Sequence, residues 1–588
     1  MVGAAPANAE RADPDHLQLS LWVAIALGFF ADLYLPLGRA GWFVQSSIGL
    51  LWPLLAACGL IAVVVGCAPV DRWDAASSAL IGLLVAWLLA IVVLDLVPPI
   101  ARDELTHHLA IPALYVRAGR VLEVPFADQA YYPMLLEMFY TPLVAHGWES
   151  VAKLLHLGFG IATAALVFAY LQGRTSTPVA LLSALLLIST PTVTVLAASA
   201  YVDLGLLFYT AVALIALLRW SETRRASYFV IAGLGAGCGA SVKYNGVLLI
   251  VLLALVVLLL ARERGALVAV GLSCAFGAIS LLPMLPWLAK NAMETGNPIF
   301  PLFNAALGGR PLPANPSIDV FTKRQLLYGE SWLEIVLTPI RVFVTGREGD
   351  PARFDGAFNP LYLVGFVALV RHDALKRDRW LAGVAAMLLL MVFLLNTFRS
   401  RYAISVLVPL ALVLAELLQV SGRQWRRATA AAVVAALLFN GWHLANLWTT
   451  VDPLSYLRGR ESRETYIGRF VPEYPLIEFA NRALPADALV DLEFLGSRGF
   501  YWQRAYRYDT YFSGTTLRDT IRSAANGDDV AARLRQIGIT HIASADRLLL
   551  RYLRDNLTET EYTCWEDFAR GHLRLIYGDR GFGLYAIG

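Results

Sequence analysis

The stretch ALIGLLVAWLLAIVVLDLVPPIARDELTHHLA, residues 79–110, joins a long apolar run to an acidic, histidine-rich turn. The apolar part reaches the roughly 20 residues that a helix needs to cross a bilayer. The rest of the chain has the same character, since 57% of its 588 residues are hydrophobic and only 16% are charged. A soluble protein carries about 25% charged residues. The composition therefore predicts a membrane-embedded chain.

Apolar runs of this kind recur along most of the sequence, and their lengths predict about 13 membrane-spanning helices. The expected fold class is an all-α polytopic membrane protein that ends in a small α/β domain. The predicted spans are 19–37, 41–66, 77–99, 151–172, 178–196, 199–219, 227–241, 245–261, 266–288, 358–370, 381–397, 402–420 and 428–448. The weakest are 178–196 and 227–241, which are short or interrupted by proline and glycine.

Basic side chains fall on alternate connections between these spans. Arg224 and Arg225, Arg377, and Arg426 and Arg427 lie on one side of the predicted membrane. The positive-inside rule places that side in the cytoplasm, together with the N-terminus. An odd number of spans then puts the C-terminus outside. We expect a multi-pass protein of a bacterial inner (plasma) membrane.

Three polar segments remain on the predicted outer side, near 100–150, 289–357 and 450–588. The last has a soluble composition, with strand-like ALVDLEF and ITHIAS, helix-like VAARLRQIGI and a hairpin-like RLIYGDRGFGLYAI. The predicted domains are an N-terminal tail with two additional spans (1–76), a membrane module (77–449) and an outer α/β domain (450–588).

Asp103 and Glu104 follow the span 77–99 directly, where a carboxylate can meet a substrate at the membrane surface. A partly desolvated carboxylate can act as a general base. The alternative is that Asp103 caps a helix starting near Leu105. His107 and His108 come four and five residues after Asp103, and Asp103 and His107 would share a helix face. Such a pair can orient a base or hold a metal. The alternative is a histidine that simply forms hydrogen bonds.

Two charged residues interrupt apolar sequence on the predicted outer side. Asp203 lies at the outer end of a span, where a carboxylate is costly and tends to be functional. The alternative is a surface residue in a short loop. Lys243 departs from the positive-inside pattern, and as an unpaired cation it can bind a lipid phosphate. The alternative is a side chain that snorkels to the interface.

Further cationic residues lie at the start of the second outer segment and just before the predicted span 402–420. Lys290 and Asn291 open the segment near 289–357, and Arg399 and Arg401 precede the span 402–420. A guanidinium binds phosphate bidentately, which would explain two arginines at an outer interface. Anchoring to lipid headgroups is the alternative.

Some chemistries find no support in the sequence. No GxxxxGK[ST] loop for nucleotide phosphates is present, and the five cysteines form no CxxC pair. We expect no nucleic-acid partner and no firmly indicated cofactor, while a divalent metal remains open.

Taken in order, these motifs resemble the GT-C glycosyltransferases that use polyprenyl-phosphate sugars, a class that includes protein O-mannosyltransferases and lipid A aminoarabinose transferases. The resemblance covers about 77–420. It rests on ARDELTHH, YYPMLLEMFYTPLV, SAYVDLGLLFYTA, GAGCGASVKYNG, PWLAKNAMETGNPIFPL and SRYAISVLVPL. The chain departs from the class in its two additional spans. It also lacks a His-Pro-Pro at 131–144, which argues against a protein acceptor.

The resemblance implies transfer of a sugar from a polyprenyl-phosphate donor to a lipid, glycan or other envelope acceptor at the outer membrane face. Asp103 would be the catalytic base of an inverting displacement, with Glu104 as its companion. The expected donor-phosphate residues are Lys243, Arg399, Arg401 and Lys290. The expected substrate pocket contains Asp203, His107, His108, Tyr131, Tyr132, Tyr244, Asn291 and Tyr402.

Other functions stay open at this point. A transporter or flippase of polyprenyl-linked glycans would explain the spans and the charges within them, but not the large outer segments. An O-antigen ligase or polymerase would use diphosphate donors and a different motif order. A purely structural or sensory membrane protein would leave Asp103, Asp203 and Lys243 without a role.

Overall fold

The computed structural model describes residues 14–67, 73–310, 312, 319–371, 376–395, 398–509 and 515–588. Most of the predicted N-terminal tail, residues 1–13, and the end of the predicted span 381–397 lie outside these ranges. The chain forms two compact units. Unit 1 contains 1–97, 133–289 and 316–453, and unit 2 contains 98–132, 290–315 and 454–588. Each part of unit 2 comes from one of the segments predicted to lie outside the membrane.

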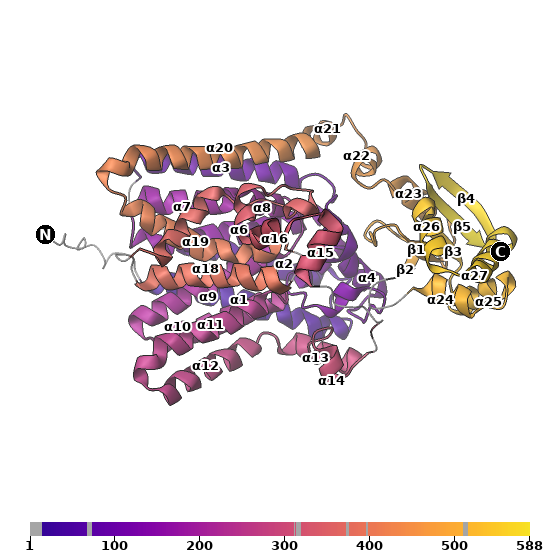
Figure 1. Ribbon diagram of the computed structural model, residues 1–588, viewed down its shortest axis with the longest axis horizontal. Coiled ribbons are helices and arrows are strands. Elements are labelled where there is room, and N and C mark those ends of the chain that lie inside the picture. The colour runs from indigo at the N-terminus through magenta and orange to yellow at the C-terminus, as the bar shows by residue number, and fades with distance from the viewer. Residues whose placement is uncertain are drawn as a thin grey trace. The chain divides into compact units, whose positions relative to one another are not determined.

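Unit 1 is a bundle of long helices that lie side by side with similar directions (Figure 1). Its first half comprises α1 (Pro14–Arg39), η1 (Ser47–Leu50), α2 (Leu51–Gly66), α3 (Ala75–Asp95), α5 (Glu137–Ala145), α6 (Glu149–Gln172), α7 (Thr177–Ser189), α8 (Pro191–Ala197), α9 (Asp203–Thr223), α10 (Ala226–Val242), α11 (Gly246–Ala261), η4 (Arg262–Arg264), α12 (Ala266–Leu281) and the start of α13 (Leu285–Thr295), which belongs to unit 2 from Lys290 onward. Its second half comprises α15 (Val320–Tyr328), α16 (Trp332–Val336), α17 (Thr338–Val344), η5 (Pro351–Arg353), η6 (Pro360–Leu369), α18 (Lys376–Leu395), η7 (Ser400–Val406), α19 (Leu407–Gln419), η8 (Arg423–Trp425) and α20 (Arg426–Val451).

Helix α9 forms the centre of the bundle. It is apolar on all sides, as expected for a buried helix. In its most apolar stretch of 18 residues, 89% of the residues are buried. It packs along α10 and α6. By contrast, only 11% of the residues in the most apolar 18-residue stretch of α20 are buried, so α20 lies at the periphery. The first residue of the central helix is Asp203, one of the predicted site residues.

The predicted polytopic fold is confirmed, but the count of 13 spans is not. Among the described residues, nine helices are long and apolar enough to span a membrane, and two bent pairs raise the count to eleven. Pro191 begins α8 directly after α7, which produces a bend of 65° within the predicted span 178–196. The second bent pair is α12 with α13, at 67°.

The other two predicted spans coincide with shorter helices, α10 and η6. Helix α10 has 17 residues, which at about 1.5 Å per residue is somewhat less than a hydrocarbon core of roughly 30 Å. The ten residues of η6 form a 3-10 helix and reach only about 20 Å. Hydropathy located both segments, but it could not distinguish a complete span from a short packed helix.

Unit 2 combines short helices with one five-stranded sheet. Its helices are η2 (Glu104–His108), α4 (Ala110–Ala118), η3 (Asp128–Tyr131), α14 (Asn304–Leu307), α21 (Pro453–Leu457), α22 (Arg463–Phe470), α23 (Tyr474–Ala483), α24 (Thr516–Ser523), α25 (Gly527–Gln536), α26 (Asp546–Asn556) and α27 (Glu559–His572). Its strands are β1 (Leu489–Glu493), β2 (Ala505–Tyr508), β3 (His541–Ala545), β4 (Leu573–Asp579) and β5 (Phe582–Ile587).

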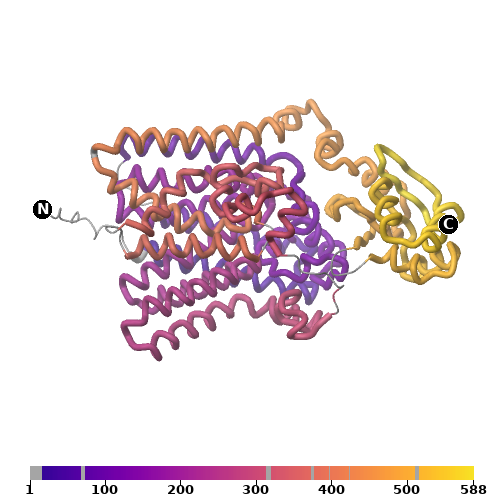
Figure 2. The backbone as a smooth tube through the Cα atoms, viewed as in Figure 1, coloured from indigo at the N-terminus to yellow at the C-terminus, as the bar shows by residue number. Residues whose placement is uncertain are grey.

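The strand order is β2-β1-β3-β5-β4. Strands β2, β1 and β3 are parallel, and β5 runs antiparallel to both β3 and β4. Figure 2 traces this C-terminal fold in yellow. The α/β fold predicted for the C-terminal segment is thus confirmed, including the hairpin β4–β5 and the helix α25 that precedes β3.

Candidate functional site

The acidic turn after α3 is a π-helix rather than an α-helix. The amide of Leu109 donates to the carbonyl of Glu104 at 3.0 Å, a five-residue step. Single π turns are rare and occur frequently at functional sites. A π turn contains about one residue more than an α turn. His107 and His108, four and five residues after Asp103, therefore both lie on the same side of the helix as Asp103.

The wide turn brings Asp103, His107 and His108 together. One ligand atom from each lies within 4.8 Å of the other two. Asp103 and His107 are half-buried and His108 is buried. A carboxylate with two imidazoles suits a zinc ion or another transition metal, so the donor set fits a metal as well as a proton-transfer site.

The two carboxylates of the turn have different surroundings. Asp103 makes no side-chain capping hydrogen bond, which contradicts the alternative that it serves as a helix cap. Glu104 is buried, and its Oε2 accepts hydrogen bonds from the amides of Ile100 at 3.1 Å and Ala101 at 2.9 Å. Glu104 therefore fixes the backbone that leads into the turn.

The C-terminal segment anchors this turn within unit 2. The amide of Phe500 donates to the carbonyl of Leu105 at 3.1 Å, and the hydroxyl of Tyr501 donates to the carbonyl of Pro99 at 2.7 Å. Leu105 also packs against Ile467 in a buried cluster. The C-terminal segment thus holds the acidic turn at Leu105 and the backbone that precedes it at Pro99.

Lys290 and Asn291 are buried in unit 2 and bind its backbone. Lys290 donates to the carbonyl of Ala130 and pairs with Glu294 at 3.3 Å. The amide of the Asn291 side chain donates to the carbonyl of Tyr131 at 2.8 Å. These contacts tie the start of the 290–315 segment to η3.

Tyr131 and Tyr132 lie at this junction. The hydroxyl of Tyr131 donates to Glu123 Oε1 at 2.5 Å, and Arg310 pairs with the same carboxylate at 3.1 Å. The ring of Tyr131 packs edge-on against Phe300. Tyr131 is therefore a buried structural contact in this arrangement, whereas Tyr132 is half-buried.

A second polar group lies in unit 1, where Lys243 pairs with Asp203 at 2.9 Å. The expectation of an unpaired cation was wrong. Helices α9 and α10 are packed neighbours, so the start of one and the end of the other meet. Asp203 is fully buried and Lys243 is partly exposed. The pair is one site rather than two.

Aromatic rings connect this pair to Arg401. The ammonium of Lys243 lies 5.2 Å from the ring centre of Tyr402, and the guanidinium of Arg401 lies 5.3 Å from the same ring centre. Arg401 also lies over Tyr201 at 5.3 Å. These distances are within the range of cation–π attraction. The structure thus brings together four predicted site residues from α9, α10 and η7; Tyr244, next to Lys243, is half-buried.

Arg399 has a different partner from Arg401. Its Nη1 pairs with Asp355 Oδ2 at 3.3 Å, and both side chains are partly exposed. The two arginines, only two residues apart, therefore belong to adjacent but distinct polar contacts. Asp355 was not singled out from the sequence, because it lies in a long polar segment without a motif.

Sequence reasoning also missed Glu137 and His156. Glu137 is buried in α5 and lies within electrostatic reach of Lys243 and Asp203. His156 Nε2 accepts from the amide of Leu204 at 3.0 Å, so this imidazole holds the first turn of α9. The signal that could have identified both residues in the sequence is an isolated polar residue within an apolar run.

The comparisons with known proteins agree with this fold. Residues 139–289 match the family model described as dolichyl-phosphate-mannose-protein mannosyltransferase. The ArnT structure from Cupriavidus metallidurans in the apo state is similar, with a TM-score of 0.52 and 15% identity over 87% of this chain and 98% of that one. The same protein bound to undecaprenyl phosphate gives a TM-score of 0.49, with 15% identity over 86% and 97% of the two chains. The archaeal oligosaccharyltransferase AglB from Archaeoglobus fulgidus, in complex with an inhibitory peptide and a dolichol-phosphate, gives 0.44, with 14% identity over 87% and 74%. No curated protein matches the sequence significantly.

The architecture is therefore that of a multi-pass membrane protein with a GT-C fold, and the resemblance to the GT-C class drawn from the sequence is confirmed. The matched family segment contains Asp203 and Lys243. Asp103, Arg399 and Arg401 lie outside it.

Proposed function

We propose that this protein is a membrane glycosyltransferase that transfers a sugar from a polyprenyl-phosphate donor to a lipid, glycan or other acceptor at the outer membrane face. The observation that carries the proposal is the π turn that gathers Asp103, His107 and His108 at the end of an apolar helix in a GT-C fold. The family matched by 139–289 is named for a dolichyl-phosphate sugar donor. The ArnT protein of similar fold is also described with undecaprenyl phosphate.

Asp103 acts as the general base in this proposal. Its carboxylate accepts the proton of the acceptor hydroxyl while that oxygen attacks the anomeric carbon, and the bond to the phosphate oxygen breaks. The configuration is inverted by this single displacement. Glu104 supports the step indirectly, because it binds the amides that lead into the turn.

Cations stabilise the departing phosphate, whose charge grows during the displacement. Arg401 is the principal candidate, because a guanidinium that lies over aromatic rings keeps its N–H donors in its own plane, in the geometry that binds a phosphate bidentately. Arg399 adds a second guanidinium. Lys243 shares its charge with Asp203, so its contribution is weaker than an unpaired lysine would give. Lys290 is buried against Glu294 and is the weakest of the four candidates.

A metal role for the turn is a second candidate, favoured by the donor set of Asp103, His107 and His108. A divalent ion held by these residues would supply positive charge to a phosphate or polarise a hydroxyl. Metal analysis of the purified protein distinguishes the two roles. If the wild-type protein binds metal stoichiometrically and the combined variant His107→Ala and His108→Ala does not, the result supports metal ligation by the turn. If the wild-type protein is fully active without metal, the result supports the general-base role of Asp103 alone.

The experiment that tests the proposed activity uses purified protein in liposomes with a polyprenyl-phosphate sugar and a cell-envelope lipid extract. The proposal predicts that free polyprenyl phosphate and a glycosylated product appear together. A transporter would move the donor across the bilayer without cleaving it. A ligase or polymerase would require a diphosphate donor, so activity restricted to such donors also contradicts the proposal.

A further inference from the structure

The turn Phe354–Asp355–Gly356 adopts an unusual backbone in unit 1. All three residues have positive φ angles, of 69°, 48° and 140°. For Phe354 and Asp355 this is the left-handed region that side chains disfavour. At Gly356 an added Cβ would collide with the hydroxyls of Ser400 and Thr192. Such strain persists only where surrounding contacts determine the conformation, and it concentrates at functional sites.

This turn sets the path of the segment that carries the two candidate arginines. The amide of Ser400 donates to the carbonyl of Phe354 at 2.8 Å, and Ser400 Oγ donates to the carbonyl of Asp355 at 3.3 Å. The carboxylate of Asp355 also binds Arg399 at 3.3 Å. A change in the turn would therefore displace Arg399 directly, and Arg401 through the backbone.

Two arginines hold the ring of Phe354, which is fully buried. The guanidinium of Arg324 lies 5.1 Å from the ring centre and that of Arg341 lies 5.3 Å from it. Arg324 comes from α15 and Arg341 from α17. Both contacts are within the range of cation–π attraction.

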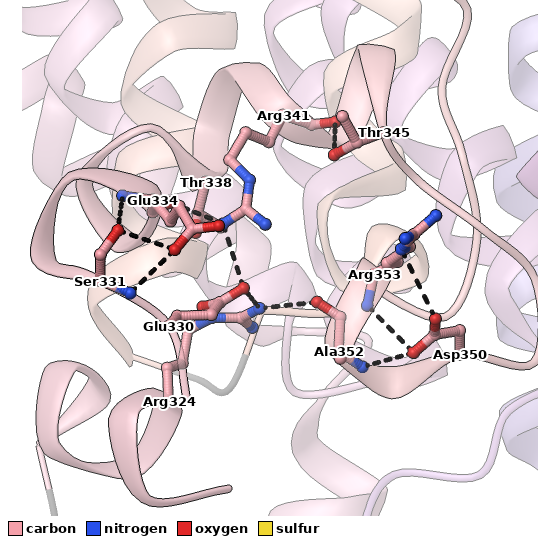
Figure 3. A network of polar contacts seen from close by, with 10 residues as sticks. All are labelled: Arg324, Glu330, Ser331, Glu334, Thr338, Arg341, Thr345, Asp350, Ala352 and Arg353. Atoms are coloured by element: carbon pink, nitrogen blue, oxygen red, sulfur yellow. Dashed lines mark hydrogen bonds and ion pairs between the residues drawn. The ribbon is translucent and has the colours of Figure 1, made fainter. Parts of the chain in front are cut away.

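Glu330 joins these two arginines (Figure 3). Its carboxylate accepts two hydrogen bonds from Arg324, at 2.5 and 2.8 Å, and one from Arg341 at 3.0 Å. Arg324 also donates to the carbonyl of Ala352 at 3.0 Å, two residues before the turn. We call Arg324, Glu330 and Arg341 the clamp.

Stability alone gives little reason for such a clamp. Arg324 is fully buried and Glu330 almost so, and burying an ion network costs as much free energy as its attraction returns. The best-attested use of such networks is to select one arrangement over its alternatives. The arrangement selected here is the strained turn that leads to Arg399.

We propose that the clamp consists of positioning residues for the donor phosphate: it fixes the strained turn at Phe354 and thereby holds Arg399 and Arg401 in place to bind the phosphate of the lipid-linked sugar. The inference rests on the proposed function. It assigns a role in donor recognition to a segment that lies outside every motif of the sequence.

The test begins with Glu330→Gln in full-length protein in nanodiscs, with a polyprenyl-phosphate sugar as the varied substrate. Loss of the carboxylate frees both guanidinium groups, so KM for the donor should rise about tenfold while kcat stays within about twofold. Glu334→Gln is the matched control, because that exposed carboxylate binds Ser331 in a helix cap rather than an arginine. Its KM should remain that of the wild type.

A mutant cycle with the combined variant Arg399→Ala and Arg401→Ala separates positioning from general damage. If Glu330 acts through these two arginines, adding Glu330→Gln to the combined variant should cause no further loss of donor affinity. Losses that multiply would overturn the proposal, because they would show that the two sites act independently. Should Glu330→Gln not fold, Phe354→Leu keeps an apolar side chain without a ring and carries the same expectation.

The cycle also distinguishes failure of this inference from failure of the proposed function. A raised KM in Arg399→Ala with a normal KM in Glu330→Gln and Phe354→Leu rejects the clamp and retains the donor-phosphate site. A normal KM in Arg399→Ala and Arg401→Ala rejects the donor-phosphate site itself, and the clamp with it.

Discussion

At the scale of single residues, the pairing of Asp203 with Lys243 constrains how either can be studied. Replacing Lys243 by methionine leaves a fully buried carboxylate without its cation. Removing one partner of a buried pair costs about 3–5 kcal/mol. A loss of activity in that variant would therefore not show that Lys243 binds the donor.

We predict that Lys243→Met lowers the unfolding temperature, whereas adding Asp203→Asn to it restores most of the loss. Thermal unfolding followed by fluorescence in detergent measures this difference. The donor affinity of the double variant then reports the role of Lys243 without the stability effect. Equal unfolding temperatures for the single and double variants would show that the pair is not electrostatically coupled.

Arg401 is the residue at which phosphate recognition is tested most sharply. Arg401→Lys keeps the positive charge but loses the planar fork and its stacking on Tyr402. We expect donor binding to weaken by about 1.5–3 kcal/mol, the range for one charged hydrogen bond. Arg379→Lys, an exposed position on the predicted cytoplasmic side, is the control. Unchanged donor affinity in Arg401→Lys would rule out bidentate binding.

The sequence located these residues better than it described their contacts. Asp103 and His107 were expected to share a helix face, because they are four residues apart, and the π turn brings His108 to the same place. Asp203 and Lys243 were each singled out, but a distance of 40 residues hides an ion pair that depends on helix packing. Asp355 and the clamp could not be predicted, because their roles arise from a strained turn.

At the scale of secondary structure, the C-terminal sheet holds an acid where strands normally hold apolar residues. Asp491 of β1 is buried, and burial, partly offset by Arg507, raises its pKa to about 7. The folded state therefore keeps a proton on this carboxyl between about pH 4 and 7, where the unfolded chain has released it. The stability of the sheet should fall as the pH rises through this window.

We predict that Asp491→Asn, which stays neutral, protects the sheet at pH 8 but gives no advantage at pH 4.5. Hydrogen–deuterium exchange of β1 and β3 in the full-length protein, corrected for intrinsic rates, measures the difference. Asp555→Asn, an exposed partner of Arg551, is the control and should change neither result. Greater protection by Asp491→Asn at acidic than at basic pH would reverse the sign and contradict the account.

Elements also show where prediction from sequence reached its limit. The alternating and continuous apolar runs of β1, β3 and the β4–β5 hairpin were recognisable. The strand β2, with the sequence AYRY, is too short and too polar to be predicted from the sequence. It forms because its backbone pairs in parallel with the edge of β1. Likewise, hydropathy placed α10 and η6 correctly but overestimated what they can span.

At the scale of the whole molecule, every proposed role depends on the orientation of the chain in the membrane. If both bent pairs are complete spans, or if neither is, the described residues contain an odd number of spans, eleven or nine, and the two ends of the chain then lie on opposite sides of the membrane. We predict that an engineered cysteine after residue 515 reacts with a membrane-impermeant reagent from outside, and one replacing Arg377 only from the cytoplasm. Labelling in the opposite sense would place the acidic turn on the wrong face for the proposed reaction.

The central claim is that Asp103 removes the proton of the acceptor hydroxyl. Asp103→Asn preserves the size of the side chain and loses its basicity. The measurement is sugar transfer from a polyprenyl-phosphate donor by the purified variant, alongside its donor affinity and its gel-filtration profile. The account predicts that transfer falls by about 10²–10⁴-fold, while donor binding and folding stay those of the wild type. Near-normal transfer by the Asp103→Asn variant would contradict the account.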